Sequence, residues 1–299
     1  MNTWTTDRER GSALLLRGAC WLTLTFGWGL GRLMLYPGTL YYYATAAQPR
    51  AASRDYLRRV LGRPVREAEI LRHFFNFASI TLDRVFLLSG RTGRFTITTE
   101  GLDALTEVID RGEGCILLGS HLGSFEALRA FGRTAPVRVS PVMYQRPGSP
   151  MTGLMQALDP SLAEDVITIG SPDAMLQVKA SLARGEIVAF LADRDPQNRS
   201  GRTVAVDFLG EPADFPTGPF ILAAVLEAPV VLFYGLRLGP RRYSIRFERF
   251  AERVILNRAT RQADLVAQVS RYSASLAAQC QVAPFNWFNF FPFWNGTHR

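Results

Sequence analysis

A short segment in the first half of the chain places a histidine and a glutamate where they could act as a general base and its partner. It reads Gly119-Ser120-His121-Leu122-Gly123-Ser124-Phe125-Glu126. On one continuous helix, residues five apart point about 140° from each other, so the spacing suits a histidine in a loop and a glutamate in the first helical turn. The Glu126 carboxylate would then fix the imidazole tautomer of His121 and leave the other ring nitrogen free as a base.

The spacing by itself is weak evidence for catalysis. The chain has three histidines and 26 acidic residues, so a carboxylate follows some histidine at this distance by chance roughly one time in four. A loop histidine is usually a structural hydrogen-bonding residue. Of the other two histidines, we expect His73 to be structural and His298 to belong to the C-terminal tail. The context favours chemistry at this segment, because Gly119 and Gly123 permit unusual dihedrals and a helix N-terminus offers donors to an oxyanion. We also expect Gly123 and Ser124 to contact substrate.

No residue near His121 is a convincing nucleophile. The G-x-S-x-G turn of hydrolases is absent, because His121 stands where that motif needs serine. We therefore expect His121 to deprotonate an incoming hydroxyl group directly. The cysteines Cys20, Cys115 and Cys280 are odd in number and show no C-x-x-C spacing, so the sequence predicts neither a metal site nor a disulfide. A reducing compartment is favoured, and no cofactor is expected.

Charged residues follow two other apolar runs. Asp193-Arg194-Asp195 comes directly after Ile187–Ala192, and Arg146 follows a run that ends near Met143. A surface turn would also explain such charges, but their place at the end of a buried strand favours contact with substrate. The Arg146 guanidinium could hold an oxyanion or a phosphate group. We expect Arg146, Asp193, Arg194 and Asp195 to bind substrate.

Apolar runs bounded by glycine alternate with helical patterns through the middle of the chain, which is typical of βαβ units. The expected strands are Cys115–Leu118, Val137–Met143, Val166–Ile169, Ile187–Ala192 and Val230–Tyr234, and the expected helices are Phe125–Phe131, Ala174–Arg184 and Phe220–Leu226. The sequence therefore predicts an α/β fold with a largely parallel sheet covered by helices. In such folds ligands bind at the carboxyl ends of the strands, where His121 is expected.

The flanking segments complete an expected domain over residues 49–299. Glu67–Leu88 shows the apolar spacing of a helix, and Pro49–Arg66 is interpreted as a polar connector that precedes it. Tyr243–Phe250 alternates apolar and polar residues, as an edge or antiparallel strand does, and a last helix is expected over about Ala263–Ala278.

Residues 1–48 are expected to form a membrane anchor. Ser12–Leu35 is strongly apolar, but Arg17 and Arg32 interrupt it. A spanning helix needs roughly 20 apolar residues, so this segment crosses a bilayer only if both arginines reach opposite interfaces. Otherwise it lies in the interface, anchored by tryptophan and tyrosine rings. A buried first helix of a soluble protein is the remaining alternative.

The formal net charge is +8, and arginine carries nearly all of the positive charge, because Lys179 is the only lysine. Codon usage in a GC-rich genome would explain the arginine bias as well as phosphate recognition would. The charge favours an anionic membrane surface or an acidic carrier protein as partner. The sequence shows no nucleic-acid-binding signature and its arginines are scattered, so a nucleic acid is not expected.

Four blocks in this order resemble the late acyltransferases of lipid A biosynthesis, within the lysophospholipid acyltransferase superfamily, which share a His-x4-Asp/Glu motif after a strand. The blocks are the apolar N-terminal segment, residues 119–126, residues 185–195, and the pair 208–213 and 218–220. The resemblance implies that His121 is the general base and Glu126 its partner. It also implies acyl carrier protein or coenzyme A as acyl donor, a membrane lipid or glycolipid as acceptor, and a location at the cytoplasmic face of a bacterial inner membrane.

Some features depart from the family pattern. Members commonly have asparagine directly before the histidine and glutamine inside the Asp-x-Asp block, where this chain has Ser120 and Arg194. The aromatic segment at 284–291 resembles a divergent subgroup associated with aryl polyene pigment synthesis. The acceptor thus stays open between lipid A, another glycolipid or a phospholipid, and a polyene-bearing lipid. Two other functions also stay open: a lipid thioesterase or hydrolase that uses water, and a non-catalytic membrane lipid-binding protein.

Overall fold

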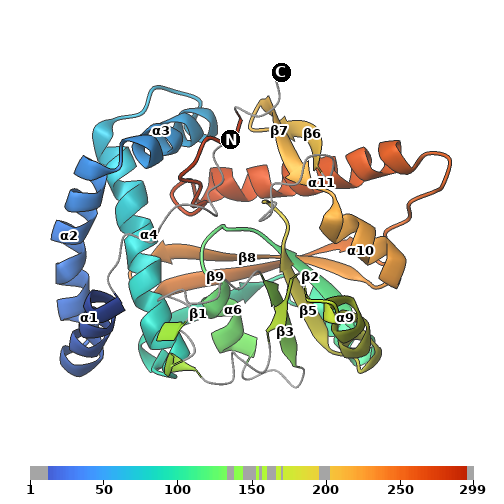
Figure 1. The fold of residues 1–299 in the computed structure, drawn as a ribbon, viewed down its shortest axis with the longest axis horizontal. Helices are drawn as coiled ribbons and strands as arrows, with labels where there is room; N and C mark the ends of the chain where they lie inside the picture. Colours follow the sequence, from blue (N-terminus) through green and yellow to red (C-terminus); the bar gives the residue numbers. More distant parts are fainter. Residues whose placement is uncertain are drawn as a thin grey trace.

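A seven-stranded sheet with helices on both faces forms the centre of the computed structural model (Figure 1). The structure describes residues 13–132, 138–143, 153–154, 157–159, 166–169, 171–194 and 203–294. The strand order is β1-β9-β8-β2-β5-β3-β4. Neighbouring strands are parallel except for β8 and β9, which pair antiparallel. The predicted α/β fold with a largely parallel sheet is confirmed.

The strands of this sheet are short except for the β8–β9 pair. They are β1 Thr96–Glu100, β2 Cys115–Gly119, β3 Val139–Met143, β4 Ile167–Thr168, β5 Ile187–Leu191, β8 Val230–Gly239 and β9 Arg242–Ala251. A separate antiparallel hairpin consists of β6 Thr203–Phe208 and β7 Glu211–Pro216. Neither this hairpin nor β1 was predicted from the sequence, whereas the antiparallel strand β9 was predicted.

The helices fall into an N-terminal group and a group that covers the sheet. The N-terminal group is α1 Ala13–Phe26, α2 Trp28–Thr45, α3 Ala47–Leu61 and α4 Glu67–Leu88, followed by a 3-10 turn at Thr92–Arg94. The second group is α5 Asp103–Asp110, α6 Phe125–Gly132, α9 Ala174–Ala183, α10 Gly218–Leu226 and α11 Arg261–Val282.

Strand β2 shows why the sheet is buried on both faces. All five of its residues are buried, and alternate side chains point to opposite faces. Ile116 and Leu118 pack in the larger core with residues of α9, α10 and α11, whereas Cys115 and Leu117 pack in a second core with residues of α5 and α6. Such double burial explains the continuous apolar run in the sequence.

The segment expected to be a polar connector is instead largely helical. Helix α3 covers Ala47–Leu61 and ends at Gly62, whose φ of +64° lies in the left-handed region that glycine favours. Its polar composition hid a narrow buried stripe, in which Tyr56 and Leu57 are completely buried against the core. The prediction of a connector over Pro49–Arg66 was therefore wrong.

Helices α1 and α2 form a hairpin that lies along α4 at one side of the molecule (Figure 1). The chain bends at Gly27, which has a φ of +91°. Large apolar side chains stand exposed on this hairpin: Trp21, Phe26, Leu33, Tyr36, Leu40 and Tyr41. No helix in the described part of the chain combines the length and apolar character that crossing a bilayer requires. The expected N-terminal membrane anchor is thus not confirmed.

Candidate active site

The loop between β2 and α6 carries His121, and the aromatic C-terminal segment holds it from one side. The Gly123 N–H donates to the carbonyl oxygen of Asn286 at 2.8 Å, and the Phe288 N–H donates to the carbonyl oxygen of His121 at 3.0 Å. A short antiparallel bridge joins Leu122 to Trp287 between these two bonds. The C-terminal segment therefore pairs with the loop almost as a strand would.

Strand β8 holds the same loop from the other side. The Ser124 N–H donates to the carbonyl oxygen of Gly235 at 2.8 Å, and Gly123 forms a parallel bridge with Gly235. Gly123 has a φ of +75°, and a Cβ atom there would collide with the Gly235 carbonyl group. The glycine is thus required both for its dihedrals and for the close approach of two backbones.

Asp193 is the hydrogen-bonding partner that the structure gives to the His121 imidazole. The Asp193 Oδ1 atom lies 2.9 Å from His121 Nδ1, and Oδ2 accepts the backbone N–H of His121 at 3.1 Å. Trp287 Nε1 also donates to Oδ2, at 3.0 Å. Asp193 is fully buried, whereas the His121 side chain is 34% exposed. Within the described residues, His121 Nε2 has no hydrogen-bonding partner.

Strand register explains this pairing. Gly119 at the end of β2 lies opposite Leu191 at the end of the parallel neighbour β5. His121 and Asp193 each stand two residues beyond those paired positions, so they meet at the carboxyl edge of the sheet. Ligands of open α/β sheets bind at this edge.

The arrangement sets the tautomer and the charge of the imidazole. A carboxylate can only accept, so Nδ1 carries the proton and Nε2 keeps its lone pair. Burial and the Arg194 guanidinium lower the pKa of His121, against the opposing charge of Asp193. Burial alone would raise the pKa of Asp193, but His121 and Arg194 outweigh it and hold that pKa well below its usual range. The pair is thus a neutral imidazole beside an ionised carboxylate at neutral pH.

Glu126 has different contacts from those expected. It lies in the first turn of α6, where its Oε1 atom is 2.7 Å from Arg84 Nε and its Oε2 accepts the Ser124 hydroxyl at 3.1 Å. No hydrogen bond joins it to His121 in the part of the chain that the structure describes. The expected bond between Glu126 and His121 is therefore not confirmed. Glu126 instead balances Arg84, whose charge contributes to lowering the pKa of His121.

Gly123 and Ser124, which were expected to contact substrate, are engaged in holding the loop. Their backbone N–H groups are used by Asn286 and Gly235, as described above. The Ser124 hydroxyl group also accepts the backbone N–H of Ala127 at 3.2 Å, which caps α6. Substrate contact by these two residues stays a prediction.

Arg194 joins the site to the aromatic segment. Its guanidinium group donates to the Phe288 carbonyl oxygen and stacks over the Phe291 ring at 5.0 Å. Its Nε atom lies 3.7 Å from Asp193 Oδ2. Arg146 and Asp195, the other predicted substrate-binding residues, lie outside the described residues. Of the predicted charged residues, the structure thus places Asp193 and Arg194 at the His121 loop.

The role of Trp287, which donates a hydrogen bond to Asp193, was not predicted from the sequence. The Trp287 carbonyl oxygen lies 3.0 Å from His73 Nε2, and the Ser53 hydroxyl lies 2.8 Å from His73 Nδ1. Burial lowers the pKa of His73 to about 4, so this histidine is neutral and structural. The aromatic density of the C-terminal segment was a visible signal, but nothing in it indicated which ring would reach the active site.

Cysteine and metal chemistry find no support in the described residues. All three cysteines are buried and free, and burial raises the pKa of the Cys115 thiol to about 12. No cluster of three or more histidine, cysteine or acidic side chains in the described segments is arranged to hold a metal ion. The imidazole of His121 is the group at this edge that is suited to proton transfer.

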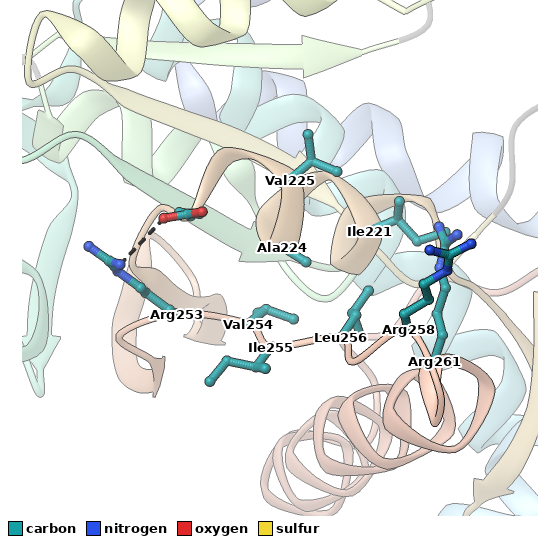
Figure 2. Close-up of a pocket in the computed structure, with 10 residues that line it drawn as sticks. Ile221, Ala224, Val225, Arg253, Val254, Ile255, Leu256, Arg258 and Arg261 are labelled. Carbon is teal, nitrogen blue, oxygen red and sulfur yellow. Dashed lines mark hydrogen bonds and ion pairs between the residues drawn. The ribbon is translucent and has the colours of Figure 1, made fainter.

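A groove of about 570 Å³ lies elsewhere, between α10 and the start of α11 (Figure 2). Ile221, Val225 and Ile255 line it together with Arg258 and Arg261. It borders the segment that leads into β8 and the segment that leaves β9, which is the amino end of the parallel strands. The groove is therefore at the opposite edge of the sheet from His121.

Comparison with known protein families shows to which family the chain is related. Residues 50–269 match the profile described as bacterial lipid A biosynthesis acyltransferase. The chain belongs to this family. The match spans more than half of the chain and includes both His121 and Asp193, whereas Trp287 lies beyond it. Membership makes the protein an acyltransferase of lipid biosynthesis. No curated protein matches the chain.

Proposed function

We propose that this acyltransferase moves a fatty acyl group from an acyl thioester to a hydroxyl group of a membrane lipid or glycolipid, with His121 as general base. One observation carries the proposal: Asp193 fixes the proton on His121 Nδ1, which leaves Nε2 free on a partly exposed side chain at the carboxyl edge of the sheet. A neutral imidazole in this tautomer is suited to remove a proton from a hydroxyl group.

The reaction then needs no enzyme nucleophile. His121 Nε2 takes the proton as the acceptor oxygen attacks the thioester carbonyl carbon. The tetrahedral intermediate collapses, the C–S bond breaks, and the imidazolium returns its proton to the leaving thiolate. An ester and a free thiol are the products. Asp193 supports this cycle because its negative charge stabilises the transient imidazolium.

The oxyanion of the intermediate needs hydrogen-bond donors. The backbone N–H groups of His121, Gly123 and Ser124 are already used by Asp193, Asn286 and Gly235. We therefore assign this role to donors of other residues, and Arg146, which follows β3 in the sequence, is the proposed side chain. Its guanidinium group could hold the oxyanion or a phosphate of the acceptor.

The N-terminal hairpin supports a membrane location for the reaction. Its exposed rings and aliphatic side chains suit the boundary between headgroups and acyl chains, where Trp and Tyr are favoured. Arg91 and Arg94 lie beside the hairpin bend, where they can meet anionic headgroups. We propose that the hairpin lies in the interface at the cytoplasmic face of the inner membrane. The net charge of +8 would also favour an anionic acyl donor, such as an acidic acyl carrier protein.

The test is to follow both products of a labelled acyl thioester. Purified full-length protein in detergent is given acyl-labelled carrier protein, or acyl-coenzyme A, together with a bacterial lipid extract. We expect one labelled acyl ester for each thiol released, identified by mass spectrometry. Labelled free fatty acid without any lipid ester would show a thioesterase instead. If the protein binds acyl thioesters of several chain lengths but consumes none of them, it is a lipid-binding protein and not an enzyme.

A further inference from the structure

A second cavity, separate from the His121 loop, lies between the N-terminal hairpin and the C-terminal segment. Its volume is about 440 Å³, which is within the range of small-ligand sites. It is half open, and it is bordered by α2, α4, the end of β8 with the β8–β9 turn, and the end of α11 with the residues after it. Three arginines line it: Arg32, Arg72 and Arg237. We call it the arginine cavity.

Arg237 is the deepest of the three arginines, with a side chain that is only 7% exposed. Its Nε atom lies 3.3 Å from the carboxylate of Asp83, and its Nη1 donates to Asn76 at 2.7 Å. Its Nη2 atom is buried and has no hydrogen-bonding partner in the described part of the chain. A buried atom does not reach a ligand in the cavity, so Arg237 contributes its positive charge to the cavity and not this hydrogen bond.

Arg32 and Arg72 are held by aromatic faces. The Arg32 guanidinium lies 5.2 Å from the centres of the Trp28 and Phe75 rings, and the Arg72 guanidinium lies 4.2 Å from the Phe285 ring. Stacking uses the face of a guanidinium and leaves its N–H edges free for in-plane hydrogen bonds.

The charge balance of the arginine cavity favours an anion. Asp83 is the carboxylate that pairs with Arg237. Neither Arg32 nor Arg72 has an ion pair with a carboxylate in the described segments. Three guanidinium groups thus face the cavity region against one negative charge. Clustered arginines with free edges match the geometry of phosphate oxygens.

The position of the cavity relates it to both the membrane and the active site. Tyr36, which is exposed on the hairpin, packs on the cavity-lining ring of Phe75 with the ring centres 4.7 Å apart. On β8, Arg237 lies two residues beyond Gly235, the residue that contacts the His121 loop, or about 7 Å along the strand. The cavity therefore lies between the apolar hairpin and the part of β8 that contacts the His121 loop.

We infer that the arginine cavity binds the phosphate group of an anionic membrane lipid. Arg32 and Arg72 would contact the phosphate oxygens with their free edges, and the charge of Arg237 would attract the phosphate from the bottom of the cavity. The acyl chains of such a lipid would leave the cavity beside Tyr36 and the exposed aliphatic residues of α2. This binding requires no acyl transfer, so it stands or falls independently of the proposed reaction.

The experiment compares two double variants that remove the same charge at opposite ends of the molecule. Arg32→Gln with Arg72→Gln alters the arginine cavity, whereas Arg258→Gln with Arg261→Gln alters the distant groove (Figure 2). Binding of the full chain is measured by cosedimentation with phosphatidylcholine vesicles, with and without phosphatidic acid. Calorimetry with inorganic phosphate, without vesicles, is the second arm.

We expect the cavity variant to lose about tenfold or more of its affinity for vesicles that contain phosphatidic acid, because charge-assisted hydrogen bonds are lost. The groove variant is expected to stay within about threefold, because surface charges more than a Debye length from the membrane are screened. Equal losses in the two variants would overturn the proposal, because diffuse surface charge would explain them. If the cavity variant loses only its binding of inorganic phosphate, the site takes free phosphate and the lipid assignment is wrong.

Arg32 also packs between two rings, so its replacement could disturb the hairpin. Arg72→Gln alone keeps the test decisive, because Arg72 is exposed and its described contact is the stack on Phe285. Thermal unfolding shows whether each variant keeps its fold. A folded Arg72→Gln variant with unchanged affinity for phosphatidic acid vesicles would contradict the proposal, and a weakened one would support it.

Discussion

Replacement of Asp193 by asparagine tests how the structure prepares His121 for catalysis. Three donors converge on the two oxygens of this carboxylate: His121 Nδ1 at 2.9 Å, the His121 backbone N–H at 3.1 Å and Trp287 Nε1 at 3.0 Å. The last two share Oδ2, and asparagine has only one oxygen. If that oxygen keeps both donors, the asparagine NH₂ group faces His121 Nδ1. The imidazole must then accept at Nδ1 and carry its proton on Nε2, where it cannot act as a base.

The expected loss of activity in Asp193→Asn follows from this change of the His121 tautomer. The variant loses a hydrogen bond to a charged group, which is worth about 1.5–3 kcal/mol, and its base is in the wrong tautomer. General-base catalysis contributes on the order of 10²–10⁴-fold to a rate, so we expect kcat/KM to fall by a factor in that range. The KM for the acyl thioester should change little, because Asp193 is fully buried. Initial rates of thiol release and of lipid ester formation measure both parameters.

Glu126→Gln is the matched control for this prediction, because its carboxylate pairs with Arg84 and Ser124. We expect a loss of about tenfold or less. The acid limb of its pH profile should move to lower pH, because Arg84 without its partner lowers the pKa of His121 further. Both variants are checked by thermal unfolding. If Asp193→Asn keeps most of its activity while Glu126→Gln loses it, the reasoning from hydrogen-bond geometry is refuted.

Three further predictions concern the same loop. Because burial lowers the pKa of His121, kcat/KM should hold from neutral pH down to below about 6.5 and then fall as the imidazole becomes protonated; an acid limb at neutral pH would contradict this. Trp287→Phe removes a donor to Asp193 and should lower kcat about tenfold with little change in KM, whereas a change confined to KM would show a different role. Gly123→Ala should lower the free energy of unfolding by about 2 kcal/mol more than Gly90→Ala, because both glycines have a φ of +75° but only the first Cβ collides with backbone. If urea unfolding shows equal losses of free energy in the two variants, dihedral strain alone explains the destabilisation and the Cβ collision contributes nothing.

The sequence predicted the sheet well because its strands are buried on both faces. The apolar runs at Cys115–Leu118 and Ile187–Ala192 had to be strands of a covered sheet, and they became β2 and β5. Helix α3 was missed because its buried stripe is narrow and the rest of its surface is rich in arginine. The extent of β8, which continues to Gly239, was also missed, because the end of this strand depends on pairing with β9.

The partner of His121 could not be read from local spacing. Glu126 was the nearest carboxylate in the expected direction, but Asp193 comes 72 residues later and meets His121 only because β2 and β5 are parallel neighbours in register. The predicted strand ends contained this information, since both residues follow their strands at equal distance. Trp287 could not be predicted, because the path of the C-terminal segment across the loop depends on tertiary contacts with α4, such as the bond to His73.

The most direct test of the proposed mechanism is the formation of lipid ester by His121→Gln. Wild-type and variant protein, matched for folding by circular dichroism and for vesicle binding, are given the same acyl-labelled thioester and lipid extract. The ester product is then counted by mass spectrometry. We predict a loss on the order of 10²–10⁴-fold or more, because the variant has no base at the position of Nε2. Retention of most of the ester-forming activity would contradict the claim that His121 removes the proton of the acceptor.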